Sequence, residues 1–302
     1  MLNKLTTEAR NPASERIDSL SAREIVDVMN GQDAGVAEAV GREADAIARA
    51  IDVIAARIRD GGRLVYLGAG TSGRLGVLDA SECPPTFSTP PEMVVGIIAG
   101  GRRALTNAVE GAEDSPQQGA DDLKTAGLSD RDVVVGIATS GRTPYVIGGL
   151  RYARELGAFA VGFSCNDGSA VSAECDLNIT PVVGPEIVSG STRLKAGTAT
   201  KMVLNMLTTG AMVRLGKTFG NLMVDLRASN TKLMDRTRRI TAQLTGLSES
   251  AAENLLNRCE GELKTAVVVQ IRDVSPEAAR QLLVQADGHL RQALEREPGH
   301  ER

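Results

Sequence analysis

Aromatic side chains are scarce in this chain: its 302 residues include three Tyr, four Phe and no Trp. Proteins that bind single-stranded nucleic acid stack bases on aromatic rings, so the composition disfavours that class of function. Acidic residues outnumber basic ones by 38 to 34, which gives a net charge of −4. A chain that bound phosphate backbones would normally be basic. We therefore expect no nucleic-acid partner.

Histidine is scarcer still, since His289 and His300 are the only two and both lie near the end of the chain. This disfavours a Ser–His–Asp or Cys–His catalytic centre and a zinc site built on histidines. The four cysteines contain no Cys-x-x-Cys pair, which favours a reducing, cytoplasmic setting. Catalysis would then depend on carboxylates, Lys, Arg, hydroxyl groups or backbone amides.

Long apolar segments are also missing. The longest uncharged run, Met202–Val213, is shorter than the about 20 residues that span a bilayer. The segment Met1–Arg10 is too polar for a secretion signal. We expect no membrane partner.

The middle of the chain alternates short apolar runs with helical patterns. The runs, which are rich in Val and Ile, are Arg63–Leu67, Met93–Ile98, Val133–Ala138, Phe159–Phe163 and Leu177–Thr180. Parallel strands covered by helices on both faces have this pattern. With helices such as Pro144–Leu156 between the runs, the sequence predicts an α/β fold with a doubly wound, mainly parallel five-stranded sheet flanked by helices.

Helical patterns stand on both sides of this region. Ser21–Glu24 forms a capping box, and apolar residues recur at helical spacing from Val36 to Ile58. A long helical pattern, Leu222–Leu244, is followed by three shorter patterns at Ser248–Cys259, Leu263–Ile271 and Pro276–Leu283. We expect an N-terminal helical segment at 1–60, a ligand-binding α/β domain at 61–220 and a C-terminal helical region, a small bundle, at 221–302.

One local sequence is repeated. Arg63–Arg74 and Asp132–Arg142 both lead from a strand into Thr-Ser-Gly-Arg and then a helix, and Ser189–Arg193 is a third turn before a helix. Loop amides, helix N-termini and hydroxyl groups favour an anion, and glycine lets the backbone approach it. At the ends of parallel strands, such turns would line the rim where open α/β sheets bind ligands. The alternative is that Thr-Ser-Gly only caps helices.

The expected ligand is a phosphate ester that is not a nucleotide. Gly68–Gly73 matches Gly-x-Gly-x-x-Gly, but the second strand ends without the acidic residue of dinucleotide-binding folds, and no P-loop follows. Arg193 and Lys195 are either surface charges or a cationic clamp. The candidate binding residues are Gly70, Thr71, Ser72, Gly73, Thr139, Ser140, Gly141, Thr143, Ser191, Arg193 and Lys195.

Two carboxylates near these loops are candidate catalysts. Glu82 precedes Pro84 and Pro85, which we expect to end a short helix and direct its side chain. Glu113 follows the second strand, and we expect it to share a helix face with Glu110. With no histidine nearby, two carboxylates in unlike environments are the natural acid–base pair. The alternative for either is an ordinary solvated side chain.

Longer motifs around these residues resemble the N-acetylmuramic acid 6-phosphate etherase family, which has the sugar isomerase fold. They are Leu67–Gly76, Leu78–Thr86, Ala108–Ser115, Thr139–Val146, Gly190–Thr198 and Phe219–Asp225. The resemblance runs from about Thr7 to about Leu294, with Thr192 and Leu194 standing where relatives often have Ser and Met.

The resemblance implies a carbon–oxygen lyase that acts as a homodimer without metal or cofactor. Such enzymes cleave the D-lactyl ether of N-acetylmuramic acid 6-phosphate with water and serve peptidoglycan recycling. The products are N-acetylglucosamine 6-phosphate and D-lactate, formed by elimination and then water addition. Glu82 matches the family's proton donor and Glu113 its second catalytic acid.

Two alternative functions share this fold. A sugar-phosphate-sensing regulator often carries a basic DNA-reading segment, whereas residues 1–60 are net acidic. A sugar-phosphate isomerase often uses a histidine for ring opening, and the α/β domain has none. Release of lactate would distinguish the etherase from both.

Overall fold

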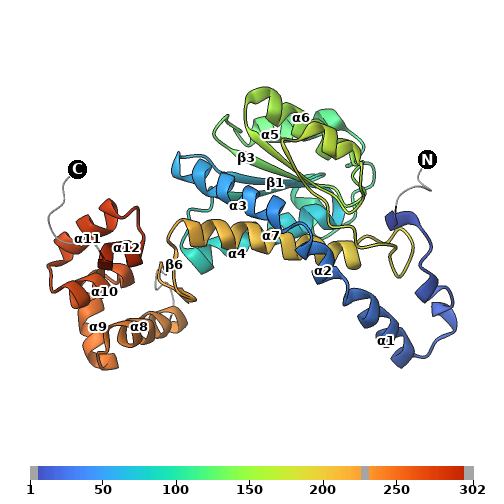
Figure 1. Cartoon of the computed structure of the whole chain (residues 1–302). Coiled ribbons are helices and arrows are strands. Elements are labelled where there is room, and N and C mark those ends of the chain that lie inside the picture. Colours follow the sequence, from blue (N-terminus) through green and yellow to red (C-terminus); the bar gives the residue numbers. More distant parts are fainter. Residues whose placement is uncertain (1–5, 226–230, 296–302) are drawn as a thin grey trace. The chain divides into compact units, whose positions relative to one another are not determined.

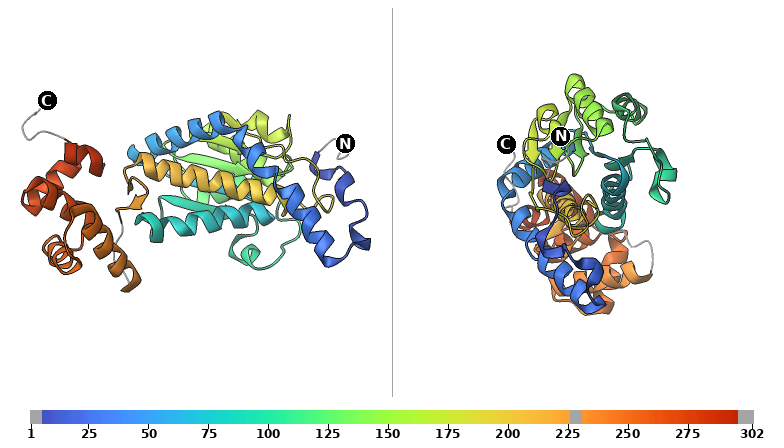
Figure 2. Two further views of the ribbon diagram at one scale, coloured as in Figure 1. Left: turned by 60° about the horizontal axis from the view of Figure 1, so that its bottom comes forward. Right: turned by 90° about the vertical axis from the view of Figure 1, so that its right-hand side faces the viewer.

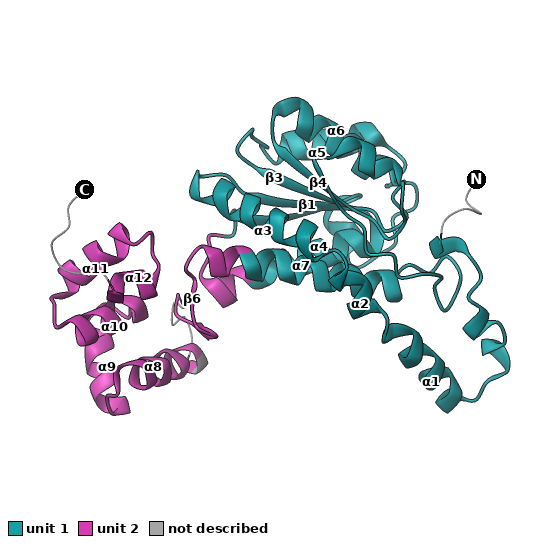
Figure 3. Ribbon diagram, in the orientation of Figure 1, with its two compact units in different colours: residues 1–82, 91–210 teal, residues 83–90, 211–302 magenta. Residues whose placement is uncertain are grey.

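The chain divides into two compact units in the computed structural model, which describes residues 6–225 and 231–295. The first unit comprises residues 1–82 and 91–210, and the second comprises residues 83–90 and 211–302 (Figure 3). The three-part division of the sequence stays a prediction.

A parallel sheet forms the centre of the first unit (Figure 1). Its strands are β1 (Leu64–Gly68), β2 (Val94–Ile98), β3 (Val133–Ile137), β4 (Phe159–Phe163) and β5 (Leu177–Ile179). The strand order is β2-β1-β3-β4-β5, and all four pairings are parallel. The predicted five-stranded α/β fold is confirmed, with β1 and β3 buried along their whole length.

Helices cover both faces of the sheet, as Figures 1 and 2 show. One face carries α5 (Pro116–Thr125) and α6 (Pro144–Leu156). The other face carries α3 (Ala44–Arg59), α4 (Gly70–Phe87) and α7 (Lys195–Arg214). Short 3-10 helices, η5 (Gly101–Leu105) and η6 (Ala170–Glu174), lie in the connections.

Side chains of β1 alternate between these two layers. Val65 and Leu67 are fully buried in the core cluster that also contains Tyr145 of α6. The intervening Tyr66 points to the opposite face, where its hydroxyl donates a hydrogen bond to Asp79 Oδ2 of α4 at 2.8 Å. Successive residues of a strand point to opposite faces, so one short strand joins both halves of the core.

The N-terminal part is helical, as expected, but more finely divided. Three 3-10 turns, η2 (Thr6–Glu8), η3 (Pro12–Ser14) and η4 (Ile17–Ser19), precede α1 (Ala22–Asp33) and α2 (Val36–Gly41). The capping box of Ser21 and Glu24 is confirmed at the start of α1. The continuous pattern from Val36 to Ile58 is two helices, α2 and α3, because Gly41 ends the first of them.

The proline pair does not end α4 before it, so that expectation was wrong. The helix continues through Pro84 and Pro85 to Phe87, where the amide of Ser88 bonds Pro84 O at 2.9 Å. Each proline removes one backbone hydrogen-bond donor. Both prolines stand in the last turns of the helix, so little of the helix follows the missing bonds.

The second unit is a helical bundle with a short hairpin. The hairpin pairs β6 (Thr218–Phe219) with β7 (Leu222–Met223), and the helices are α8 (Thr231–Thr245), α9 (Glu249–Arg258), α10 (Leu263–Arg272), α11 (Pro276–Gln285) and α12 (Leu290–Glu295). The expected helix over Leu222–Leu244 is wrong at its start, because Gly220 adopts a left-handed φ of 56° and turns the chain. Part of that range, 226–230, lies outside the described residues.

Candidate active site

The first Thr-Ser-Gly loop joins β1 to α4 at the carboxyl edge of the sheet. Its glycines allow a very tight turn, since a Cβ on Gly73 would lie 2.7 Å from Gly68 O. Gly70 has a φ of +53°, in the left-handed region that favours glycine. Helix α4 therefore begins directly after the strand, and Thr71 and Ser72 stand in its first turn.

The second loop follows β3 and leads into α6. Gly141 has a φ of +70°, and a Cβ there would overlap the side chain of Ser169. Thr143 precedes α6, and among the described residues its side chain makes no capping hydrogen bond to that helix. Because β1 and β3 are adjacent parallel strands, this loop lies beside the first one. The edge therefore presents the N-termini of α4 and α6.

The third turn, Ser189–Arg193, leads into α7. A Cβ on Gly197 would lie 3.9 Å from Thr71 Cγ2, so the first turn of α7 stands beside the first loop. The fully buried carboxylate of Glu186 accepts hydrogen bonds from the amides of Lys195 at 2.9 Å and Ala196 at 3.0 Å. An anion is favourable at a helix N-terminus, and here the protein supplies its own.

The polar residues of this third turn differ in exposure. Ser191 is half-buried and Arg193 is exposed, whereas Lys195 is buried, with 5% of its surface accessible. The Lys195 ammonium donates a hydrogen bond to Pro185 O at 3.0 Å. Burial lowers the pKa of Lys195, and the carboxylates of Glu186 and Asp33 oppose this effect. The structure thus pairs Lys195 within the chain and leaves Arg193 in solvent.

Glu113 lies at the same carboxyl edge as the loops. Its carbonyl oxygen accepts a hydrogen bond of 3.0 Å from the amide of Tyr145, in the first turn of α6, and its side chain is exposed. The expectation that Glu110 and Glu113 share a helix face is wrong, because residues 110–113 form a turn. Gly111 within this turn has a φ of 73°, which a helix cannot accommodate.

Glu82 lies toward the opposite, amino edge. Helix α4 runs antiparallel to β2, because Gly73 packs on Ile98 at the end of the strand and Val77 packs on Gly96 in its middle. Glu82 is exposed and lies more than a turn beyond Val77. Its backbone is about 16 Å along the helix from the first loop. The structure brings Glu113 and the loops to one edge and places Glu82 near the other.

Asn166, a residue that the sequence did not single out, supports the second loop. Its Nδ2 donates hydrogen bonds to Thr139 O at 3.0 Å and to Thr7 Oγ1 at 3.1 Å, while its Oδ1 accepts one from the Thr6 hydroxyl at 2.8 Å. The side chain is 2% exposed. Its place just after β4, at the ligand-binding edge of a parallel sheet, was the available signal. Glu186 stands nine residues before the start of α7, so no local sequence pattern indicated that it would bond that helix.

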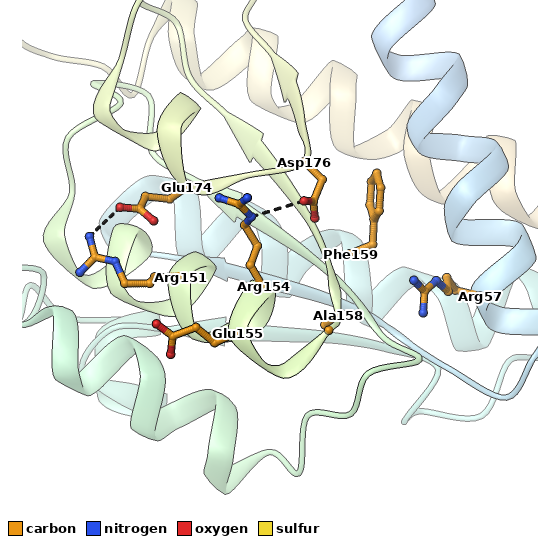
Figure 4. Close-up of a pocket in the computed structure, with 9 residues that line it drawn as sticks. Arg57, Arg151, Arg154, Glu155, Ala158, Phe159, Glu174 and Asp176 are labelled. Atoms are coloured by element: carbon orange, nitrogen blue, oxygen red, sulfur yellow. Dashed lines mark hydrogen bonds and ion pairs between the residues drawn. The ribbon is translucent and has the colours of Figure 1, made fainter.

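A hollow of about 580 Å³ lies at the amino edge of the sheet, where β4 begins (Figure 4). Arg151 Nη2 lies 2.6 Å from Glu174 Oε1, and Arg154 Nε lies 3.3 Å from Asp176 Oδ1. The lining residues are Arg57, Arg151, Arg154, Glu155, Gly157, Ala158, Phe159, Glu174 and Asp176. Because carboxylates pair with two of its arginines, this hollow is a poor match for a sugar phosphate.

Within residues 6–225 and 231–295, no helix is long and apolar enough to cross a membrane. In the same part of the chain, no three His, Cys, Asp or Glu side chains are grouped so that they could hold a metal ion.

The chain is similar to two family models and to solved structures. Residues 46–154 match the family model described as the glucokinase regulatory protein N-terminal SIS domain, and residues 114–210 match the SIS domain model. Among solved structures, a phosphoheptose isomerase from Francisella tularensis is 20% identical, with a TM-score of 0.49, over 62% of this chain and 98% of that one.

Curated relatives are much more similar in sequence. An N-acetylmuramic acid 6-phosphate etherase from Rhodopirellula baltica is 66% identical and covers 90% of this chain and 90% of its own length. An enzyme of the same name from Escherichia coli strain ED1a is 55% identical over 98% of this chain and 99% of its own. Identity at this level over nearly the whole chain shows that the protein belongs to the N-acetylmuramic acid 6-phosphate etherase family.

Proposed function

We propose that this protein cleaves the D-lactyl ether of N-acetylmuramic acid 6-phosphate with water, giving N-acetylglucosamine 6-phosphate and D-lactate. The observation that carries the proposal is the 66% identity to an etherase over 90% of the chain. The two adjacent Thr-Ser-Gly loops at one edge of the sheet support it, because the substrate's phosphate needs an anchor of this kind.

The phosphate binds where α4 and α6 begin. Amides of the first turn of α4 and the hydroxyl groups of both loops supply hydrogen-bond donors, and the glycines let the phosphate approach the backbone. The residues assigned to this anchor are Gly70, Thr71, Ser72, Gly73, Thr139, Ser140, Gly141 and Thr143. The first-turn amides of Tyr145 and Val146 in α6 bond Glu113 O and Thr143 O, so α6 contributes its helix dipole to this anchor.

The third turn contributes less directly. Ser191 and Arg193 contact the sugar or its lactyl carboxylate, and exposed Arg193 is the cation suited to that carboxylate. Lys195 supports the turn, since its ammonium bonds Pro185 O. This division of roles follows from the difference in exposure between the two cations.

Glu113 and Glu82 act as base and acid in an elimination followed by an addition. In the open-chain sugar, the ether oxygen on carbon 3 is β to the aldehyde, so the hydrogen on carbon 2 is acidic. Glu113 removes that proton and Glu82 protonates the departing lactate oxygen. Water then adds at carbon 3 and a proton returns to carbon 2. Glu113 takes the base's role because it lies at the edge that anchors the phosphate.

The proposed setting is the cytoplasm, where the enzyme acts in peptidoglycan recycling. It works as a homodimer with no metal or cofactor, and it binds no nucleic acid. The net charge of −4 supports the last point.

Lactate release tests the activity. Purified protein supplied with the substrate and a metal chelator should release D-lactate, and the sugar without its phosphate should be a poor substrate. A sugar-phosphate sensor or isomerase would release none. Loss of activity with chelator, restored by a divalent ion, would contradict the metal-free reaction.

Isotope labelling tests the mechanism. In heavy water, the N-acetylglucosamine 6-phosphate product should carry deuterium at carbon 2, because elimination removes that hydrogen and solvent replaces it. In water labelled with heavy oxygen, the carbon 3 hydroxyl should carry the label and lactate should not. Product without deuterium would exclude elimination and favour direct displacement.

A further inference from the structure

The N-terminal segment Thr6–Ser14 carries more buried polar side chains than its short length would suggest. Thr7, Asn11 and Ser14 are all almost fully buried. A buried polar group needs a hydrogen-bond partner, because leaving it unpaired costs free energy. These three side chains find partners that lie 159 to 174 residues later in the chain. The segment therefore joins parts of the first unit that are distant in sequence.

The side chain of Thr7 is bonded to the support of the second loop. Thr7 Oγ1 accepts a hydrogen bond of 3.1 Å from Asn166 Nδ2, and the same nitrogen donates to Thr139 O at 3.0 Å. Thr139 O also accepts a hydrogen bond of 2.9 Å from the amide of Cys165. Thr139 is the first residue of the second Thr-Ser-Gly loop. Thr7 thus contacts the start of that loop through one intervening side chain, that of Asn166.

The backbone around Thr7 is bonded to the third turn. Thr7 O accepts a hydrogen bond of 3.2 Å from the amide of Gly190, and Ala9 O accepts one of 3.4 Å from the Ser189 hydroxyl. Gly190 has a φ of +77°, and a Cβ there would lie 3.1 Å from Glu8 Oε2. The segment therefore packs directly on the turn that leads to Ser191 and Arg193.

Thr7 and Asn166 are out of reach of a ligand. The exposed fraction is 0% for Thr7 and 2% for Asn166. The two segments that they join are the ones assigned to opposite ends of the substrate, the phosphate and the lactyl carboxylate. Two anchors on separate loops bind one ligand best when their separation is already fixed in the free protein, because binding then has less to order.

We propose that Thr7 is a positioning residue of the active site. Together with Asn166, it holds the second Thr-Ser-Gly loop and the third turn at the separation that the substrate requires. The inference rests on the proposed function of these two segments. Thr7 touches no substrate atom and acts through Asn166 on one side and Gly190 on the other. The anchored groups are held alike before and during the reaction, so loss of the bridge should raise KM and leave kcat nearly unchanged.

Two substitutions of Thr7 that differ only in the hydroxyl test this role. Thr7→Val replaces the hydroxyl with a methyl group of similar size, and Asn166 keeps its bond to Thr139 O. We expect KM for lactate release to rise roughly fivefold, the scale of one buried hydrogen bond that has lost its partner. Thr7→Ser keeps the hydroxyl and should restore KM to within about twofold of wild type. A wild-type KM in Thr7→Val would overturn the proposal.

Thr200→Val is the matched control for an effect on stability alone. Thr200 is also fully buried in the first unit, and its hydroxyl donates a hydrogen bond of 2.7 Å to Ala196 O within α7. Both valine variants should lower the midpoint of thermal unfolding, and only Thr7→Val should raise KM. If KM rose equally in both, the effect would follow stability, and the positioning role of Thr7 would be refuted.

A double-mutant cycle tests whether Thr7 acts through Asn166. Asn166→Ala is a second way to break the bridge, and it should raise KM more than Thr7→Val because it also removes the bond to Thr139 O. Adding Thr7→Val to Asn166→Ala should then raise KM little further, since residues in one hydrogen-bond network are not additive. Two effects that simply multiplied would show that Thr7 does not act through Asn166, contrary to the proposal.

Hydrogen exchange in the free protein gives a readout that does not depend on activity. In Thr7→Val, amides of the second loop and of the third turn should both exchange faster than in wild type, while those of α5 keep their rate. Unchanged exchange in both segments would contradict the bridge. Wild-type protein that released no lactate would instead refute the proposed function, so the two failures are distinguishable.

Discussion

The two edges of the sheet in the first unit carry positive charge in different forms. At the amino edge the cations are guanidinium groups, and Arg151 and Arg154 are paired with Glu174 and Asp176. At the carboxyl edge the charge is the partial positive charge of the helix dipoles at the starts of α4 and α6. Anion-binding capacity therefore does not follow the number of basic side chains, because paired guanidinium groups are largely neutralised.

The carboxyl edge itself contains a second contrast, between α6 and α7. The N-terminus of α7 is bonded to the buried carboxylate of Glu186, whereas the first-turn amides of α6 bond the backbone carbonyls of Glu113 and Thr143. Similar sequence turns can therefore lead to helix starts that are satisfied in different ways, one by a side-chain acid and the other by backbone carbonyls.

Loss of the base at the carboxyl edge should have the largest effect. Glu113→Gln should lower kcat at least about a hundredfold, the usual scale for a general base, with little change in substrate affinity. Glu110→Gln is the control, since Glu110 is also exposed and lies in the same turn. Steady-state lactate release by both variants decides the question, and near-normal kcat in Glu113→Gln would refute its role.

Distortion of the second loop should have the next largest effect. Gly141→Ala places a Cβ at a φ of +70° and against Ser169, so the loop must move and KM should rise at least about tenfold. Gly168→Ala has a similar φ of +61° but open space around the new Cβ. It should lose some stability and keep its KM. Equal KM values for both variants would contradict binding of the substrate's phosphate by the second loop.

A single hydroxyl at the carboxyl edge should matter more than a guanidinium at the other. Ser140→Ala should raise KM about tenfold, which corresponds to loss of one hydrogen bond to a charged group, and leave kcat nearly unchanged. Arg154→Gln removes a full charge from the amino edge and should leave both constants unchanged. A larger rise in KM for Arg154→Gln than for Ser140→Ala would contradict phosphate binding at the carboxyl edge.

The smallest expected effect is an acid-dependent loss of stability at the amino edge. Burial alone would raise the pKa of Asp132, but hydrogen bonds from the Arg63 side chain and the Ser129 amide outweigh it and hold the pKa below its ordinary value. A lowered pKa adds stability above the unfolded value of about 3.9, and this stability is lost as pH falls through the folded value.

Urea unfolding at pH 6 and at pH 3 measures that contribution. Wild-type protein should lose more unfolding free energy between these two values than Asp132→Asn, which has no proton to gain there. Glu92 is exposed in the turn before β2, and Glu92→Gln should follow the wild-type profile closely. Equal losses in wild type and Asp132→Asn would show that the Arg63–Asp132 pair adds nothing above pH 4.

Local sequence patterns were sufficient to predict the strands and the positions of the Thr-Ser-Gly loops. The runs around Val65, Val95 and Val135 are apolar on both faces, and this pattern is itself the mark of a covered parallel strand. The Thr-Ser-Gly loops were equally readable, because the need for glycine at Gly73 and Gly141 arises from the tight strand-to-helix turn. The course of the chain at Pro84 and at Gly220 was misjudged, since tertiary packing overrides the local preference of single residues.

Sequence alone predicted the family, the parallel sheet, the Thr-Ser-Gly loops and the two candidate acids, because each of these depends on short contiguous motifs. Tertiary structure decided that α4 carries Glu82 away from the loops, that Glu186 occupies the start of α7, and that Asn166 and Thr7 meet behind the second loop. The number of residues between two positions in a helix gives only the distance between them along that helix. Which edge of the sheet a side chain reaches depends on the direction in which the helix packs across it.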